Sequence, residues 1–165
     1  MDPKPVSHSR TTLAHWMSIL DANSSGNVHG GTVLKMADEA AGLTAVKHSH
    51  QRVVTAGVDR VNFVVPIHIG ELVTFSASVN AVWHTSMEVG VRVEAENPLT
   101  GEIRHTTTAY FTMVALDADG NPTAVPPLIV TEPAEERRMR EAELRRRNRL
   151  DERDQILGGR EPTAG

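Results

Sequence analysis

The sequence contains no cysteine, and this absence excludes disulfide bonds, zinc–thiolate sites and cysteine nucleophiles together. Aromatic residues make up only 4% of the 165 residues, and no apolar run approaches the roughly 20 residues that cross a bilayer. The first ten residues lack a basic segment followed by an apolar one, so no secretory signal is expected. A formal net charge of -4 does not indicate the basic surface that binds nucleic acid. We therefore expect a cytoplasmic protein that binds neither nucleic acid nor membrane.

Charged residues are distributed unevenly along the chain. Residues 131–165 hold 9 of the 17 basic and 9 of the 21 acidic residues, so the net charge belongs entirely to residues 1–130. Glu and Arg clusters spaced three and four apart predict an exposed, ion-paired helix in this tail, or a partly disordered end. A phosphate or nucleic-acid patch at Arg145–Arg147 is less favoured, because acidic neighbours neutralise it. We expect an N-terminal extension (1–9), one folded domain (10–130) and the charged tail.

Hydrophobic patterns predict one long helix and a set of strands in the folded domain. Gly30 to about His48 is rich in Ala, Leu, Met and Val, and it is long enough for a buried helix. Strict alternation of apolar and polar residues, clearest after Gly70 and again from Met87, indicates a sheet with one face buried and one in solvent. The order of elements favours an α+β arrangement in which a curved antiparallel sheet wraps around the helix. Strands are expected over residues 10–20, 52–63, 70–83, 86–96 and 103–116.

Asp38 is the first residue that could carry chemistry. Its neighbours on the helical wheel, at positions 31, 34, 41, 42 and 45, are all Gly, Ala or Leu. Burying an unpaired carboxylate among them is costly, and such an environment is typical of a catalytic acid or base. An ordinary exposed helical aspartate explains the pattern equally well. Glu39 is adequately explained as an ion pair with Lys35.

The segment GNVHGG, residues 26–31, precedes the helix. Gly30 and Gly31 would leave backbone N–H groups open to a ligand at the helix N-terminus, where the dipole favours negative charge. This arrangement predicts an oxyanion site for acyl transfer. The simpler interpretation is that Asn27 caps the helix and that the glycines allow close packing. His29 completes a His-Gly-Gly sequence of the kind found in serine esterases, but the chain has no Gly-x-Ser-x-Gly.

Other motifs with a known chemistry are missing from the sequence. It contains neither the phosphate-binding GxxxxGK[ST] nor GxGxxG. His48 and His50 could suggest a metal pair, but no carboxylate or third histidine follows at ligand spacing, so no metal is expected. For a hydrolase, Asp38 is then the strongest candidate carboxylate.

Three segments together resemble the hot-dog-fold acyl-CoA thioesterases. They are GNVHGGTVLKMADEAAGLTA, VVTAGVDRVNFVVPIHIGELV and HTSMEVGVRVEAENPLTG. The similarity runs from about Arg10 to Pro127 and is strongest to the branch that contains the cytosolic long-chain acyl-CoA hydrolase and its short bacterial relatives. It implies a five- or six-stranded antiparallel sheet wrapped around the helix. It also implies a homodimer with sites at the subunit interface, and often a hexamer of three such dimers.

The resemblance further implies the reaction and its residues. In the family a helical carboxylate, matched by Asp38, and a loop amide, matched by Asn27, come from opposite domains of a pair. Asp38 would be the base or the nucleophile in the hydrolysis of fatty acyl-CoA, and Asn27 would position the water or the carbonyl. N–H groups around Gly30 and Gly31 would hold the oxyanion. No cofactor is expected, because coenzyme A is part of the substrate and product.

Four further residues are candidates for substrate binding. Thr55 matches a hydroxyl that approaches the site in relatives, although an ordinary strand threonine is the plain interpretation. Thr85 and Ser86 match a turn that contacts the CoA nucleotide, and a simple hairpin turn explains them nearly as well. His29 lies in the oxyanion segment. Two other functions remain open: an acyl-CoA-binding module without catalysis, and a hot-dog hydratase or dehydratase, for which no matching histidine motif is found.

Overall fold

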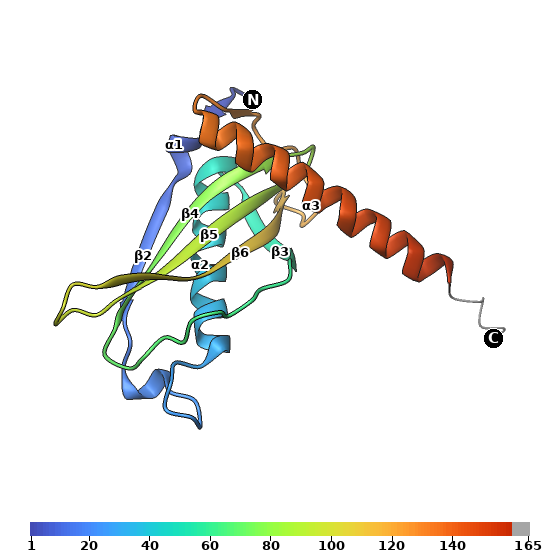
Figure 1. The fold of residues 1–165 in the computed structure, drawn as a ribbon. Coiled ribbons are helices and arrows are strands. Elements are labelled where there is room, and N and C mark those ends of the chain that lie inside the picture. The colour runs from blue at the N-terminus through green and yellow to red at the C-terminus, as the bar shows by residue number, and fades with distance from the viewer. Residues whose placement is uncertain (160–165) are drawn as a thin grey trace.

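A long helix lies in the concave side of a curled, five-stranded antiparallel sheet in the computed structural model, which describes residues 1–159 (Figure 1). The helix is α2 (Gly30–Ser49), and the strand order in the sheet is β2-β4-β5-β6-β3. The α+β prediction is confirmed. The strands are β2 (Thr11–Trp16), β3 (Arg52–Val58), β4 (Leu72–Val82), β5 (Ser86–Glu96) and β6 (Ile103–Leu116).

Two strands are shorter than the sequence predicts. Strand β2 ends at Trp16 because Ser18 begins a 3-10 turn, η1 (Ile19–Asp21), in which the Asp21 carboxylate accepts the Ser18 N–H at 2.7 Å. Strand β3 ends at Val58, five residues before its expected end at Phe63. From there the chain leaves the sheet and runs past the N-terminus of α2, which places a long loop beside the helix start.

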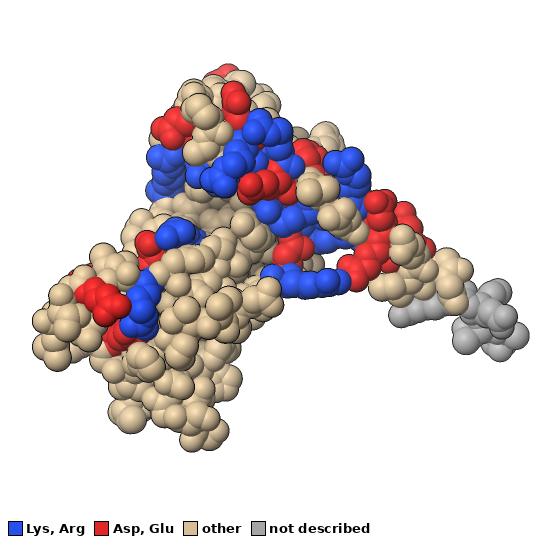
Figure 2. Space-filling view, viewed as in Figure 1, with Lys and Arg blue, Asp and Glu red and all other residues tan. Residues whose placement is uncertain are grey.

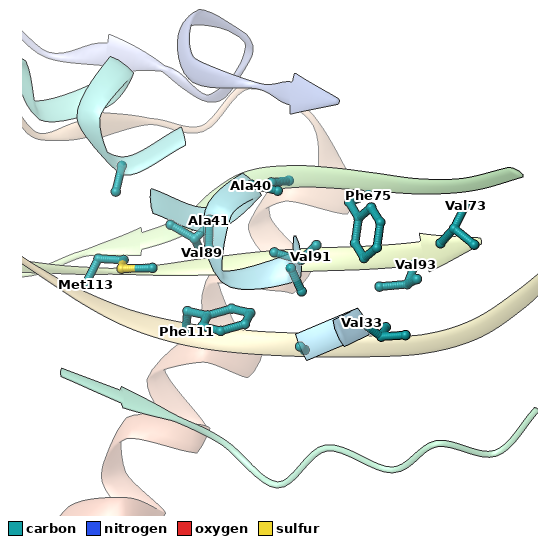
Figure 3. Packing of buried hydrophobic residues seen from close by; sticks show 14 of the residues in the cluster. Val33, Ala40, Ala41, Val73, Phe75, Val89, Val91, Val93, Phe111 and Met113 are labelled. Atoms are coloured by element: carbon teal, nitrogen blue, oxygen red, sulfur yellow. The ribbon is translucent and has the colours of Figure 1, made fainter. Parts of the chain in front are cut away.

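The core lies between α2 and the inner face of the sheet. Small side chains on the helix, such as Ala37, Ala40 and Ala41, are almost completely buried and let the sheet approach closely. Phe75 and Phe111 are the largest fully buried side chains of the sheet, and each contributes about 1.5–3 kcal/mol on burial. Figure 3 shows these rings and the neighbouring valines meeting the helix. The period-two alternation of the sequence therefore does separate a buried face from a solvated one.

The first nine residues pack onto the domain. Strand β1 (Lys4–Pro5) pairs in parallel with β7 (Leu128–Ile129), and in the short helix α1 (Val6–Ser9) both terminal residues are buried. The described chain has no helix that is both long and apolar enough to span a membrane.

Helix α3 (Pro133–Gly158) crosses the outer face of the sheet at one end and then projects away from the body (Figure 1). Figure 2 shows basic and acidic side chains intermixed along it. The predicted helix is confirmed. The first half of α3 also packs against the domain, because Glu135 and Ala142 are buried. Arg10 reaches Glu135 at 2.8 Å and ties the helix start to the domain.

A buried ion cluster fixes the middle of α3. Glu88 of β5 is fully buried, and Arg145 donates to both of its carboxylate oxygens, at 2.6 and 3.1 Å. The Arg145 guanidinium also lies 3.6 Å from the centre of the Tyr110 ring. Asn80 donates to Glu88 at 3.0 Å, and Arg149, which pairs with Asp59 just after β3 at 2.7 Å, also lies 3.8 Å from Glu88. Arg145 is therefore engaged with the sheet, which argues against a free phosphate patch at positions 145–147.

Candidate active site

Asp38 and Thr55 meet at the side of the molecule where α2 passes the edge strand β3. Asp38 is half-buried, and Thr55 Oγ1 donates a hydrogen bond of 2.6 Å to its Oδ1. The two side chains line an open depression of about 450 Å³ together with Gly31, Leu34, Lys35, Val58 and Phe111. A carboxylate with one oxygen held by a hydroxyl keeps its other oxygen available to a water or a substrate. Asp38 is thus more than a bare surface aspartate.

Asn27 lies in the loop before α2, where the chain pairs briefly with the loop that follows β3. An isolated bridge joins Asn27 to His68, and the Asn27 side-chain oxygen lies 3.1 Å from His68 Nδ1. The interpretation of Asn27 as the helix cap is wrong. His29 is the N-cap, and its Nδ1 accepts the Gly31 N–H at 2.9 Å. The amide of Asn27 is therefore free of the helix.

The predicted oxyanion groups at the helix start have different surroundings. The Gly31 N–H is bonded to the His29 ring, so an oxyanion there would have to displace the imidazole. A Cβ on Gly30 would meet the Phe63 ring at 3.5 Å, which is ordinary contact, so this glycine is not required by crowding. Both residues lie at the start of a 20-residue helix, where the dipole favours negative charge.

Asn27 and Asp38 do not share one depression within a chain. Asn27 lines a hollow of about 330 Å³ with Gly30, Val33 and Phe63, among others. Asp38 lies further along α2, and the rise of about 1.5 Å per residue separates it from the helix start by roughly 12 Å. The structure therefore brings Asp38 and Thr55 together and leaves Asn27 at a second place, near the start of the helix.

The edge strand β3 is open on the side away from β6. Six of its seven residues are exposed, including Val54 and Val58, and Leu43 and Val46 of α2 are exposed as well. An unpaired strand edge beside apolar side chains is a template for pairing with another chain. The Asp38–Thr55 pair lies directly beside this edge.

Thr85 and Ser86 form the turn between β4 and β5. Their carbonyl groups accept the N–H groups of Ala115 and Trp83, so the backbone of this turn is largely satisfied. In the sheet, Ser86 pairs with Val114, which is next to the residue that pairs with Thr55. The turn thus lies at the Thr55 end of the sheet but about 10 Å away, two strands across.

The two histidines considered as a metal pair have structural surroundings. His48 is fully buried, with Nε2 2.9 Å from the carbonyl oxygen of Pro126. His50 is the C-cap of α2, in a left-handed conformation with φ of 54°. Within residues 1–159, no three His, Asp or Glu side chains gather in a way that could hold a metal ion.

His68 and its supporting residues have no signature in the sequence. Glu71 is 5% exposed, accepts the His68 N–H at 2.8 Å, and is paired with Arg104 through both oxygens, at 2.8 and 3.1 Å. Burial alone would raise the pKa of Glu71, but the Arg104 and His68 hydrogen bonds outweigh it and lower that pKa below its usual value. A histidine in a loop indicates nothing by itself, so only the tertiary contact with Asn27 identifies this group.

A curled antiparallel sheet wrapped around one long helix is the architecture of a hot-dog domain, and here a carboxylate–hydroxyl pair lies at its open edge. The family model described as Thioesterase superfamily matches residues 25–102. The Helicobacter pylori protein VdlD is 44% identical over 105 residues, which are 64% of this chain and 60% of that protein. The acyl-CoA thioester hydrolase YkhA of Bacillus subtilis, itself uncharacterized, is 36% identical over 129 residues, covering 78% of this chain and 74% of YkhA. The cytosolic acyl coenzyme A thioester hydrolase of Rattus norvegicus is 34% identical over 142 residues, which are 85% of this chain and 37% of that protein.

Solved structures agree with these relatives. An apo-hexameric acyl-CoA thioesterase superposes with a TM-score of 0.89 at 39% identity, over 92% of this chain and 97% of that one. An acyl-CoA hydrolase from Staphylococcus aureus, solved with butyryl coenzyme A, coenzyme A and coenzyme A disulfide, gives 0.85 at 31% identity, over 94% and 96%. Variants of that enzyme with an aspartate, an asparagine or a threonine replaced by alanine have also been solved. This chain belongs to the thioesterase superfamily. It spans only 60% of VdlD and 37% of the rat hydrolase.

Proposed function

We propose that the protein hydrolyses fatty acyl-CoA to a free fatty acid and coenzyme A, at a site completed by a second copy of the chain. The observation that carries this proposal is the 2.6 Å bond between Thr55 and Asp38 beside the open edge of β3. A carboxylate there can act on a thioester that enters along the subunit interface. Asn27, which lies away from Asp38 in one chain, would be supplied by the partner.

The reaction then needs few groups. Asp38 removes a proton from a water molecule that attacks the thioester, or attacks the thioester itself to form an acyl anhydride that water then hydrolyses, and the Thr55 hydroxyl holds the carboxylate in place. The new C–O bond turns the thioester carbonyl into an oxyanion, and breaking the C–S bond releases the CoA thiolate. The partner's Asn27 and N–H groups at Gly30 and Gly31 would stabilise the oxyanion, with each donor worth about 3–4 kcal/mol. We propose that no metal or other cofactor takes part.

The Staphylococcus aureus enzyme supports this assignment. Its replaced aspartate and threonine are 17 positions apart, which is the spacing of Asp38 and Thr55. The third replaced residue of that enzyme is an asparagine 15 positions before the aspartate, which is the spacing of Asn23 from Asp38, whereas Asn27 lies 11 positions before Asp38. Thr85 and Ser86 remain proposed contacts of the CoA portion, and His29 remains a proposed contact of the substrate.

The assembly proposed is a homodimer through β3 and α2, with three dimers in a hexamer. Two similar solved thioesterases are described as hexameric, which supports the larger assembly. We further propose a cytoplasmic location, as the name of the rat relative indicates for that protein, and no nucleic-acid or membrane partner.

A free-thiol assay with acyl-CoAs from two carbons to long chains tests the activity. Asp38→Asn removes the base or nucleophile with little change in shape, and should lower kcat by about 10²–10⁴-fold. Glu39→Gln is the matched control, since Glu39 is exposed and its single ion pair within residues 1–159 is with Lys35, at 3.9 Å. Full turnover in Asp38→Asn would refute the assignment. Saturable acyl-CoA binding without thiol release in the unaltered protein would instead support a binding module.

Subunit mixing tests the shared site. Asn27→Ala and Asp38→Ala chains are each inactive alone, but a mixed dimer keeps one intact site. Random exchange should restore about a quarter of the unaltered activity, because half the dimers are mixed and each has one of two sites. Mixed dimers confirmed by mass spectrometry but still inactive would show that both residues act within one chain.

A further inference from the structure

Helix α3 crosses the outer face of the sheet strand by strand, toward the open edge at β3 (Figure 1). Trp83, which directly follows β4, donates a hydrogen bond of 2.9 Å from its Nε1 to Glu143. Two residues further along the helix, Arg145 pairs with Glu88 of β5 and lies over the ring of Tyr110 of β6. Since the strand order is β4-β5-β6-β3, the helix advances toward β3 as it crosses the sheet.

The helix makes its last ion pairs with the described part of the domain just after β3. Arg149 pairs with Asp59 at 2.7 Å, and Glu152 pairs with Arg60 at 3.1 Å. Residues 153–158, which we call the overhang, continue beyond this point, and every one of them is exposed. At about 1.5 Å per residue the overhang extends roughly 9 Å, which is the width of about two further strands. It therefore lies where a sheet continued by a second copy would be.

Ile156 continues the row of side chains that α3 directs at the domain. That row has a spacing of three and four positions and consists of Ala142, Arg145, Arg149 and Glu152. Ile156 is the next member, four positions after Glu152, and it is 54% exposed because the helix has passed the end of the sheet there. Leu157 beside it is 53% exposed. The overhang thus presents apolar side chains on the side that faces the sheet in the rest of the helix.

The outer face of the sheet also has exposed apolar surface beside the open edge. Val54 of β3 pairs with Val114 of β6, and Arg52 pairs with Leu116. These residues point to the outer face, because Met113, which alternates with them, is fully buried against the helix. Val54 is 45% exposed, and Leu116 is half-buried. A second apolar surface is therefore available at the same edge.

We propose that the overhang of α3 is a clamp that packs on the outer face of a second copy of the chain, across the paired β3 strands. This inference rests on the proposed function, which places the dimer interface at β3. In a two-fold dimer the contact forms twice, and Ile156 and Leu157 of each chain cover apolar surface near Val54 of the other. Two-fold pairing makes the β3 strands antiparallel, so their ends at Val58 lie roughly 20 Å apart. Two helices of about 10 Å diameter fit side by side in that space.

The clamp lies next to the proposed catalytic site without being part of it. Val58 lines the depression at Asp38 and also a hollow of about 480 Å³ under α3, to which Tyr110 and Arg149 contribute. Asp38 belongs to the helix on the inner face of the sheet, whereas α3 crosses the outer face. Loss of the clamp should therefore weaken the dimer and leave kcat of the assembled dimer unchanged.

Ile156→Asp tests the clamp, with Leu144→Asp as the matched control. Leu144 is 50% exposed on the same helix but lies outside the row that faces the sheet. Native mass spectrometry over a dilution series should show a dimer dissociation constant about 10- to 100-fold higher in Ile156→Asp, because an apolar contact is lost twice per dimer. Leu144→Asp should leave that constant unchanged. Equal dissociation constants in the two variants would overturn the inference. So would an Ile156→Asp protein that loses only hexamers, since the contact would then lie between dimers.

Thiol reactivity gives a second test that does not depend on an added charge. The chain has no cysteine, so Ile156→Cys and Leu144→Cys each introduce a single thiol. At a concentration where dimers dominate, the thiol at position 156 should react with a thiol reagent at least about tenfold more slowly, because the partner covers it. The two rates should become equal once dilution separates the subunits. Equal rates in the dimer would refute the clamp.

The outcomes distinguish this inference from the proposed function. If Ile156→Asp weakens the dimer but the unaltered protein releases no thiol from any acyl-CoA, the clamp stands and the proposed function fails. If the unaltered protein hydrolyses acyl-CoA and Ile156→Asp leaves the dimer dissociation constant unchanged, only the clamp is refuted.

Discussion

Replacing Arg145 should destabilise the protein far more than replacing Arg147, two positions away on the same charged helix. Arg145 is the partner of Glu88, whose side chain has no exposure at all, and it donates to both carboxylate oxygens. Arg147 is exposed and has no ion pair within residues 1–159. Both arginines lie in the same run of charged residues. A difference in stability between the two variants therefore tests the tertiary contacts of the two side chains.

The expected magnitude follows from what Arg145→Ala leaves behind. Glu88 would keep only the 3.0 Å bond from Asn80 and a distant guanidinium, that of Arg149, at 3.8 Å. Removing one partner of a buried ion pair costs about 3–5 kcal/mol, and loss of the stacking on Tyr110 adds about 0.5–1 kcal/mol. For a chain of this length the two losses together correspond to roughly 7–24 °C in Tm, whereas Arg147→Ala should change stability by less than about 0.5 kcal/mol.

Urea denaturation at one fixed protein concentration measures the difference, because assembly makes apparent stability depend on concentration. Adding Glu88→Gln to Arg145→Ala should recover part of the loss, since a neutral amide does not need a guanidinium in the interior. Equal midpoints for Arg145→Ala and Arg147→Ala would refute the reasoning, and would mean that α3 does not hold Glu88 in solution.

Two further predictions concern other buried polar groups. Burial lowers the pKa of His48 below its ordinary value of 6.5, although the hydrogen bond to the carbonyl oxygen of Pro126 acts in the opposite direction. Below about pH 6.5, His48 is therefore protonated to a greater extent in the unfolded chain than in the folded one. The free energy of unfolding should therefore fall between pH 7.5 and pH 5.5, and His48 should contribute at most about 1.4 kcal/mol per pH unit to that fall. His48→Gln should lack this contribution. An equally steep fall in the variant would contradict the assignment. Gly90→Ala should cost about 1–3 kcal/mol in urea denaturation, because its Cβ would lie 2.6 Å from Asn80 Nδ2, while Gly57→Ala, with nothing within 4 Å, should cost little. Similar losses in the two glycine variants would argue against crowding at Asn80.

The elements of the fold could be predicted because their signals are local. Alternation in β4 and β5 places the apolar side chains on one face, and the long apolar run from Gly30 predicts the helix that covers it. The ends of elements were harder to predict. The early end of β2 depends on Ser18 and Asp21 capping a turn, and the helix cap depends on which side chain, Asn27 or His29, turns toward the Gly31 N–H.

The candidate site, too, was only partly predictable from the sequence. Asp38 and Asn27 stand out in the sequence through their neighbours and through the resemblance to hot-dog thioesterases. That Thr55 reaches Asp38 depends on how β3 pairs with β6 and where α2 crosses it. That Asn27 and Asp38 line different hollows in one chain is also a property of the packed structure, and it is consistent with the shared site that the resemblance implies.

The sequence by itself determines the long helix, the alternating strands, the lack of thiol chemistry and the family to which the chain belongs, since each is recorded in the order and spacing of neighbouring residues. Only the tertiary structure decides that Arg145 is buried against Glu88, 57 positions away, and that His68 holds the amide of Asn27, 41 positions away. The physical reason is that hydrogen bonds and ion pairs act over a few ångströms in space. Residues this far apart in the chain leave no periodic trace of the contact that folding creates between them.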